Sequence, residues 1–359
     1  MKVKSKFKNI ERPNKAITQF RKPEKLWLDK NENSDEVLFK KTKKILNSLD
    51  KRAIFSYPDL APLYIKLSKS LKINTKNILL TAGSDAGIKT VFETFINKGD
   101  IVFRTNPTFA MYSVYSKVFN VKEILLEYKK TNFGPKIKMD QIITKILLKK
   151  PKLICLPNPD SPTGHAFTLR EIEKLLIKAK SVNSLVLIDE AYYPFYACTV
   201  KSLIQKYKNL IITRTTAKAW GLAGLRVGYV MASENIIKEM QKTRPMYEIN
   251  NIGAEVFYKL LDKSKFINTS VARLLSGKQY FKKELIKLGF NLFNKEEGNF
   301  IHVNFKKDRK RIVNELKKKI YFRHLEKHKS MKNFSRFTIT SKKNFKTIIL
   351  IIKKCTKKN

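Results

Sequence analysis

Acidic residues are scarce in this sequence. Its 359 residues include only 30 Asp and Glu beside 75 Lys and Arg, which gives a net charge of +45. The basic residues run through the whole chain, so we interpret most of them as a solvated surface that would attract anionic ligands. Nucleic-acid or membrane binding would require them to gather on one module or one amphipathic helix. We therefore expect neither a nucleic acid nor a membrane as partner.

Cysteine and histidine are also scarce, with three and four residues respectively. Cys155, Cys198 and Cys355 are odd in number and far apart, which excludes a disulfide framework and a metal-ligand spacing and indicates a reducing compartment. The apolar stretch 348–352 is far too short to cross a bilayer. The basic first 15 residues lack the apolar core of a signal peptide, so we expect a cytoplasmic protein without a metal.

The hydrophobic content of 43% is enough for a large core, and the length suits one large and one small domain. Short apolar runs alternate with helical patterns in the first two thirds of the chain. The run at 185–188 is continuously apolar, which is typical of a parallel strand covered on both faces. The sequence thus predicts an α/β fold with a mostly parallel central sheet.

The most informative stretch is 213–233, TRTTAKAWGLAGLRVGYVMAS. It predicts a strand, a loop carrying Lys218, a Gly-rich turn, Arg226 and a second strand. A buried Lys has a lowered pKa, and its neutral amine can hold a carbonyl compound as a Schiff base. Arg226 could clamp a phosphate with its planar guanidinium. The alternative is a solvated Lys and a surface Arg.

This stretch resembles the cofactor-lysine segment of fold-type I aminotransferases, which use pyridoxal 5′-phosphate (PLP). Within them it is most similar to the histidinol-phosphate aminotransferase branch. The resemblance implies that Lys218 holds PLP as a Schiff base and that Arg226 binds its phosphate. Ala217 departs from the Ser that usually precedes the Lys, and Thr215 is placed to supply another hydroxyl.

Further segments resemble cofactor-binding motifs of the same family, in the same order along the chain. A strand at 77–81 leads into AGSDAG, where Ser84 is predicted to cap a helix whose backbone N–H groups bind phosphate. The other motifs are PTF, NPDSPTG and DEAY. The resemblance assigns binding of the cofactor phosphate to Gly83, Ser84 and Asp85, and stacking on the cofactor ring to Phe109. It assigns contact with the ring nitrogen to Asp189, and contact with the phenolic oxygen to Ser161 and Tyr192. Ser161 replaces the usual Asn.

Three more motifs concern substrate and partner. Asn31, in the NEN segment, and Arg336, in the alternating strand 335–340, resemble substrate-binding residues; the Arg would grip a carboxylate. Tyr57, before a Pro, resembles the residue that reaches across a homodimer to the partner's cofactor phosphate. On pattern alone, each could equally be a turn or surface residue.

The resemblance implies a large PLP-binding domain at 36–255 and a small α+β domain at 256–359, which the segment 1–35 joins. The activity it implies is a PLP-dependent aminotransferase, by default acting on histidinol phosphate and 2-oxoglutarate. Ser161 and the unusual PMYEIN segment at 245–250 leave other amines open, linked to phosphate, phosphonate or a sugar nucleotide. A related PLP decarboxylase and a basic nucleic-acid-binding protein on a PLP scaffold are the remaining alternatives.

Overall fold

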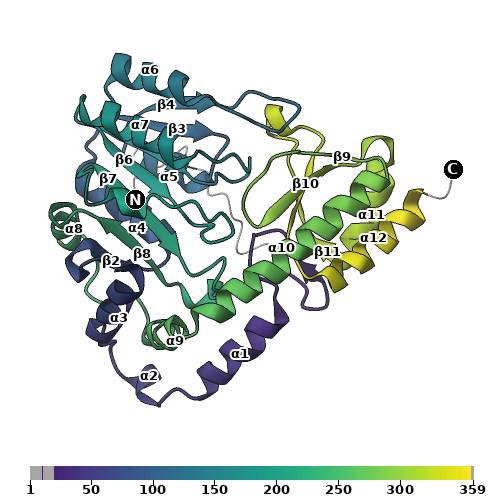
Figure 1. Cartoon of the computed structure of the whole chain (residues 1–359), viewed down its shortest axis with the longest axis horizontal. Helices are drawn as coiled ribbons and strands as arrows, with labels where there is room; N and C mark the ends of the chain where they lie inside the picture. Colours follow the sequence, from purple (N-terminus) through teal and green to yellow (C-terminus); the bar gives the residue numbers. More distant parts are fainter. Residues whose placement is uncertain (1–9, 11–19, 357–359) are drawn as a thin grey trace, which may run out of the picture.

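The computed structural model describes residue 10 and residues 20–356. Figure 1 shows a larger part built on a twisted sheet and a smaller part at the C-terminal end of the chain, with the long helix α10 beside their junction. The predicted absence of a signal peptide concerns residues 1–15, which lie outside the described residues except for Ile10. No helix in the described part is long and apolar enough to span a membrane.

The larger part contains a seven-stranded sheet. In spatial order its strands are β2 (Ile78–Thr81), β8 (Gly228–Ala232), β7 (Leu210–Thr215), β6 (Leu185–Asp189), β5 (Leu153–Pro157), β3 (Ile101–Asn106) and β4 (Lys122–Glu127). Only β8 pairs antiparallel with its two neighbours; the other pairings in this sheet are parallel. The predicted mostly parallel sheet is therefore confirmed, and the carboxyl ends of β5, β6 and β7 meet at one edge.

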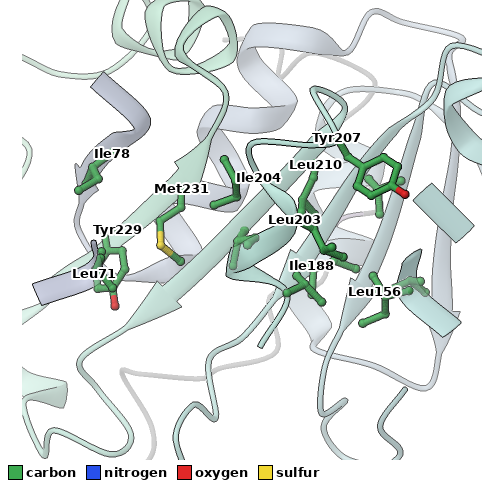
Figure 2. Close-up of a cluster of buried hydrophobic side chains, with 14 of the residues drawn as sticks. Leu71, Ile78, Leu156, Ile188, Leu203, Ile204, Tyr207, Leu210, Tyr229 and Met231 are labelled. Carbon is green, nitrogen blue, oxygen red and sulfur yellow. The ribbon is translucent and has the colours of Figure 1, made fainter. Parts of the chain in front are cut away.

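Helices cover both faces of this sheet because the strands are apolar on both sides. Leu187 faces a cluster formed with α4 (Ser84–Phe95), α5 (Ala110–Val118) and α8 (Glu234–Gln241). Ile188, the next residue, faces a cluster that includes Leu71, Leu156 and Met231 (Figure 2). The helices that contribute to this second cluster are α3 (Ala61–Leu71), α6 (Met139–Lys149), α7 (Leu169–Lys180) and α9 (Asn251–Leu261).

The start of α4 differs from the prediction by one residue. Its N-cap is Gly83, with φ +85°, and Ser84 is the first helical residue. Glycine adopts this left-handed conformation readily because it has no Cβ. The prediction of Ser84 as the cap was therefore wrong, since the tight approach of the chain after β2 requires the glycine at that position.

The smaller part is a four-stranded antiparallel sheet with three helices. Its order is β12 (Arg323–His324), β13 (Ser335–Thr338), β10 (Phe300–Asn304) and β9 (Asn291–Leu292), and its helices are α10 (Ser264–Lys287), α11 (Arg309–Lys319) and α12 (Lys342–Thr356). The predicted half-burial of the strand at 335–340 is wrong. All four residues of β13 are buried, because the strand lies between β12 and β10 and packs against α10.

Residues near the N-terminal end pack with this smaller part. The short strand β1 (Leu26–Trp27) pairs in parallel with β11 (Ile320–Tyr321), and Leu28 belongs to the same apolar cluster as Ile301 and Phe337. The chain then crosses to the larger part through α1 (Glu36–Asn47) and α2 (Arg52–Phe55). Helix α9 spans the predicted domain boundary after residue 255, and its Phe257 packs in the core of the larger sheet.

Candidate active site

A cavity of about 460 Å³ opens at the carboxyl ends of β5, β6 and β7 and reaches the smaller domain. Most residues that the sequence singled out line it: Asn31, Ser84, Asp85, Phe109, Ser161, Asp189, Tyr192, Thr215, Lys218, Arg226 and Arg336. They come from segments up to 305 residues apart that only the fold brings together. The cavity is therefore the candidate active site.

Lys218 lies on the loop that follows β7. Its Nζ donates a 2.8 Å hydrogen bond to the carbonyl oxygen of Lys30. Burial, together with the guanidinium groups of Arg336 and Arg226, lowers the pKa of Lys218 to about 8, although Glu32 and Asp189 act against this. Its amine thus loses its proton far more easily than a solvated Lys, as a nucleophile toward a carbonyl carbon must.

Asp189 ends β6 and is buried. Its Oδ1 accepts hydrogen bonds from Thr213 Oγ1 at 3.0 Å and from the Ala191 backbone N–H at 3.1 Å, both uncharged donors. Burial raises its pKa to about 6. A carboxylate in this environment would be stabilised by a cationic N–H group in the cavity.

Gly83 and Arg226 form a cradle for an anion at the start of α4. Arg226 Nη2 donates to the Ala82 carbonyl at 3.2 Å, and a Cβ on Gly83 would lie only 2.7 Å from that nitrogen. On the other side, a Cβ on Gly228 would lie 2.5 Å from the Gly83 carbonyl carbon. The two glycines therefore let a helix N-terminus and a guanidinium converge, which is a favourable arrangement for phosphate.

Phe109 and Tyr192 provide the aromatic part of the lining. Phe109 is 39% exposed and meets Tyr112 edge to face. The Tyr192 hydroxyl accepts a 2.8 Å hydrogen bond from Asn31 Nδ2, and burial raises the pKa of Tyr192. The backbone N–H of Asn31 in turn donates to Thr338 Oγ1 on β13, so residues of both domains hold this phenol in place.

Arg336 is a buried guanidinium bonded to neutral oxygens. Nη1 donates to Ser161 Oγ at 3.1 Å and Nη2 to the Asp29 carbonyl at 2.9 Å, while Nε is buried without a hydrogen-bond partner. Burial lowers its pKa. A carboxylate or phosphate that entered the cavity could satisfy this charge with two parallel hydrogen bonds.

Sequence reasoning missed part of this wall. His324 and His328 also line the cavity, beside Arg336. Arg323, which the sequence suggests as a further contact to a substrate anion, lines it too. Arg323 and His324 form β12, a strand of only two residues, so the sequence has no periodicity that could have revealed it. Thr108, next to Phe109, was missed as well.

Tyr57 does not line the cavity of its own chain. It is 76% exposed, and its ring stacks on Tyr247 with a centroid distance of 4.2 Å and an interplanar angle of 13°. Ile54, Phe55 and Met246 are exposed apolar residues of the same segments. The structure thus leaves this group of side chains, in the isolated chain, facing away from the protein.

The chain is similar to known proteins over almost its whole length. The model of the family described as aminotransferase class I and II matches residues 23–352. A histidinol-phosphate aminotransferase from Thermoanaerobacter pseudethanolicus is 34% identical over 322 residues, which cover 89% of this chain and 90% of the relative.

Solved structures agree in fold. The histidinol-phosphate aminotransferase from Sinorhizobium meliloti, in complex with pyridoxal-5′-phosphate, superposes with a TM-score of 0.77 at 18% identity, covering 92% of this chain and 90% of that chain. L-threonine-O-3-phosphate decarboxylase from Porphyromonas gingivalis reaches 0.75 at 19% identity, covering 92% and 98%. The sequence match over nine tenths of the chain decides the family: the protein belongs to the class I and II aminotransferases, enzymes whose cofactor is PLP.

Proposed function

We propose that this aminotransferase moves the amino group of a small phosphorylated amine, by default histidinol phosphate, to a 2-oxo acid, by default 2-oxoglutarate. The observation that carries the proposal is the placement of Lys218 and Arg336 on one cavity. An amine poised to lose its proton faces a buried guanidinium that lacks an anionic partner among its hydrogen bonds. The names of the sequence relatives support the default donor.

The residues present fit PLP. Lys218 would bind its aldehyde carbon, Asp189 its ring nitrogen, Arg226 and the start of α4 its phosphate, and Phe109 would cover its ring. When bound, PLP supplies an electron sink for the carbanion that forms at the donor carbon. Tyr192, held by Asn31, would donate a hydrogen bond to the phenolic oxygen.

The chain's own groups carry out the proton transfers. Asp189 would hold a proton on the ring nitrogen, because an ionised buried carboxylate is stabilised by a neighbouring N–H cation. Lys218 Nζ would take the proton from the donor carbon, because its lowered pKa leaves part of it neutral near pH 7. Arg336 orients the oxo acid by pairing with its carboxylate.

We infer further that the working unit is a homodimer in which Tyr57 completes the partner's site. The support is a set of exposed large apolar side chains on α1, on α2 and the residues after it, and on the segment between α8 and α9: Phe39, Ile54, Phe55, Tyr57, Met246 and Tyr247. Apolar groups of this size are stabilised when a second surface removes them from water. The stacked Tyr247 would hold Tyr57 in position.

We also propose that the enzyme works in the cytoplasm. Its three cysteines are free thiols, and Cys155 and Cys355 are buried. Unpaired cysteines are the usual state in a reducing compartment.

The test is the visible spectrum of the PLP-loaded protein before and after histidinol phosphate is added alone. Loss of the band of the lysine-bound cofactor, with growth of the band of its aminated form, would support both the half-reaction and the donor. An unchanged spectrum would reject histidinol phosphate as the donor. Release of carbon dioxide from L-threonine O-3-phosphate would instead indicate a decarboxylase.

A further inference from the structure

Asp160 is a fully buried carboxylate directly below the cavity lining, on the loop between β5 and α7, with 0% of its surface exposed. Its Oδ2 accepts hydrogen bonds from Thr105 Oγ1 at 2.5 Å and from the Tyr128 hydroxyl at 2.8 Å. Its Oδ1 accepts one from Thr108 Oγ1 at 2.6 Å. One side chain thus ties together the end of β3, the turn before α5 and the residue after β4.

Two of the joined segments carry side chains that line the cavity. Thr108 directly precedes Phe109, and Ser161 directly follows Asp160. Phe109 is the aromatic residue proposed to cover the cofactor ring, and Ser161 is the hydroxyl that accepts from Arg336. A shift of the Asp160 carboxylate would therefore also displace two residues of the cavity lining, Phe109 and Ser161.

The chemistry of the three donors favours a carboxylate over an amide. An ionised Asp is a pure acceptor, whereas Asn would point an N–H₂ donor at Thr108 or at the pair formed by Thr105 and Tyr128. The three hydroxyl donors offset much of the cost of burying the charge, although burial still raises the pKa of Asp160 to about 7.

We propose that Asp160 is a positioning residue of the cofactor site, which holds Phe109 through Thr108 and Ser161 through its own main chain. The proposal rests on the proposed function, since it takes the roles of Phe109 and Ser161 from there. It adds a residue that touches neither cofactor nor substrate and acts only through these two neighbours.

The experiment titrates apo-protein with PLP, for wild type and for Asp160→Asn, Asp160→Ala and Thr108→Val. Fluorescence gives the dissociation constant, and the induced visible circular dichroism reports how the bound ring is held. Asp160→Ala should weaken PLP binding about tenfold or more, because three buried hydroxyls lose their acceptor. Thr108→Val and Asp160→Asn should show smaller losses in the same direction, each with an altered dichroism.

A matched control is Asn77→Ala at the opposite end of the sheet. Asn77 is buried and donates a 2.8 Å hydrogen bond to the Ala232 carbonyl. Replacing Asn77 should therefore lower the stability of the protein without changing the residues that line the cavity. We expect unchanged PLP binding and dichroism in this variant. Equal weakening in Asn77→Ala at equal loss of stability would overturn the proposal, because the effect would then be general.

Wild-type binding and dichroism in the Asp160 and Thr108 variants would also overturn it. Should Asp160→Ala fail to fold, Thr108→Val and Asp160→Asn decide the question alone. Failure of the proposed substrate is distinguishable, because PLP binding would stay intact in wild type. A wild-type protein that did not bind PLP would overturn the cofactor site and this proposal together.

Discussion

Arg336 and Ser161, 175 residues apart, meet across the cavity through a 3.1 Å hydrogen bond from Nη1 to Oγ. Arg336 lies on β13 of the smaller domain, and Ser161 lies on the loop after β5 of the larger one. This contact links the two domains directly at the candidate active site. A substrate carboxylate would compete with the Ser161 hydroxyl for the same guanidinium N–H groups.

Arg336→Gln should therefore raise the KM for the 2-oxo acid strongly. Loss of charge-assisted hydrogen bonds to a carboxylate corresponds to a change of roughly tenfold to hundredfold. Steady-state kinetics with varied oxo acid measure this, and PLP binding should change little. Arg170→Gln, at an exposed position on α7, is the control. An unchanged KM in Arg336→Gln would exclude Arg336 as the carboxylate site.

Lys218→Ala should bind PLP without a covalent bond and lose turnover, because Lys218 is the cavity residue whose amine pKa is lowered by burial and by the guanidinium of Arg336. Reduction with borohydride followed by mass analysis checks the attachment. Lys201→Ala is the matched control, since Lys201 Nζ also donates to a backbone carbonyl, that of Leu71, away from the cavity. Transamination retained by Lys218→Ala would contradict the assignment.

Gly83→Ala should abolish tight cofactor binding, whereas Gly99→Ala should not. Both glycines have positive φ, +85° and +90°, so alanine strains the backbone in each and costs about 1 to 3 kcal/mol of stability. Only at Gly83 does the new Cβ meet the Arg226 guanidinium; at Gly99 nothing lies within 4 Å. The measurements are the PLP dissociation constant and thermal unfolding. Equal PLP affinities in the two variants would contradict the proposal that Gly83 and Arg226 form the site of the cofactor phosphate.

Tyr57→Ala and Lys218→Ala should complement each other in mixed dimers. In such a dimer one site keeps both its own Lys218 and the partner's Tyr57. Random pairing of equal amounts should restore about a quarter of wild-type activity, because half of the dimers are mixed and each has one intact site of two. Activity after co-refolding measures this. No recovery, with mixed dimers present, would place Tyr57 outside the partner's site.

The contribution of Asp160 and Asp189 to the stability of the apo-protein should fall as the pH rises from about 4 to 7. The pKa values of Asp160 and Asp189 are raised to about 7 and about 6, so the native state keeps protons that the unfolded chain releases near pH 4. Urea unfolding at several pH values checks this: the stability of wild type relative to that of Asp189→Asn should fall over this pH range. If the stability of Asp189→Asn changed with pH as steeply as that of wild type, the effect would belong to other groups.

Much of the larger domain was predictable because its signals are local. The apolar runs at 185–188 and 210–212 are strands of a mostly parallel sheet, as predicted. The loop lysine and the aspartate that ends β6 line one cavity, as their motifs implied. The smaller domain was less predictable: the alternation at 335–340 indicated a half-buried strand, but neighbours on both sides bury it completely.

By itself, the sequence determined which residues could do chemistry and the order in which strands and loops present them. Periodicity and motif spacing are properties of neighbouring residues. Tertiary structure decided the rest: that Arg336 meets Ser161, that His324 and His328 reach the cavity, and that Asp160 joins three segments through buried hydroxyls. Such contacts join residues far apart in the chain, so their geometry depends on how the two domains and the sheet pack.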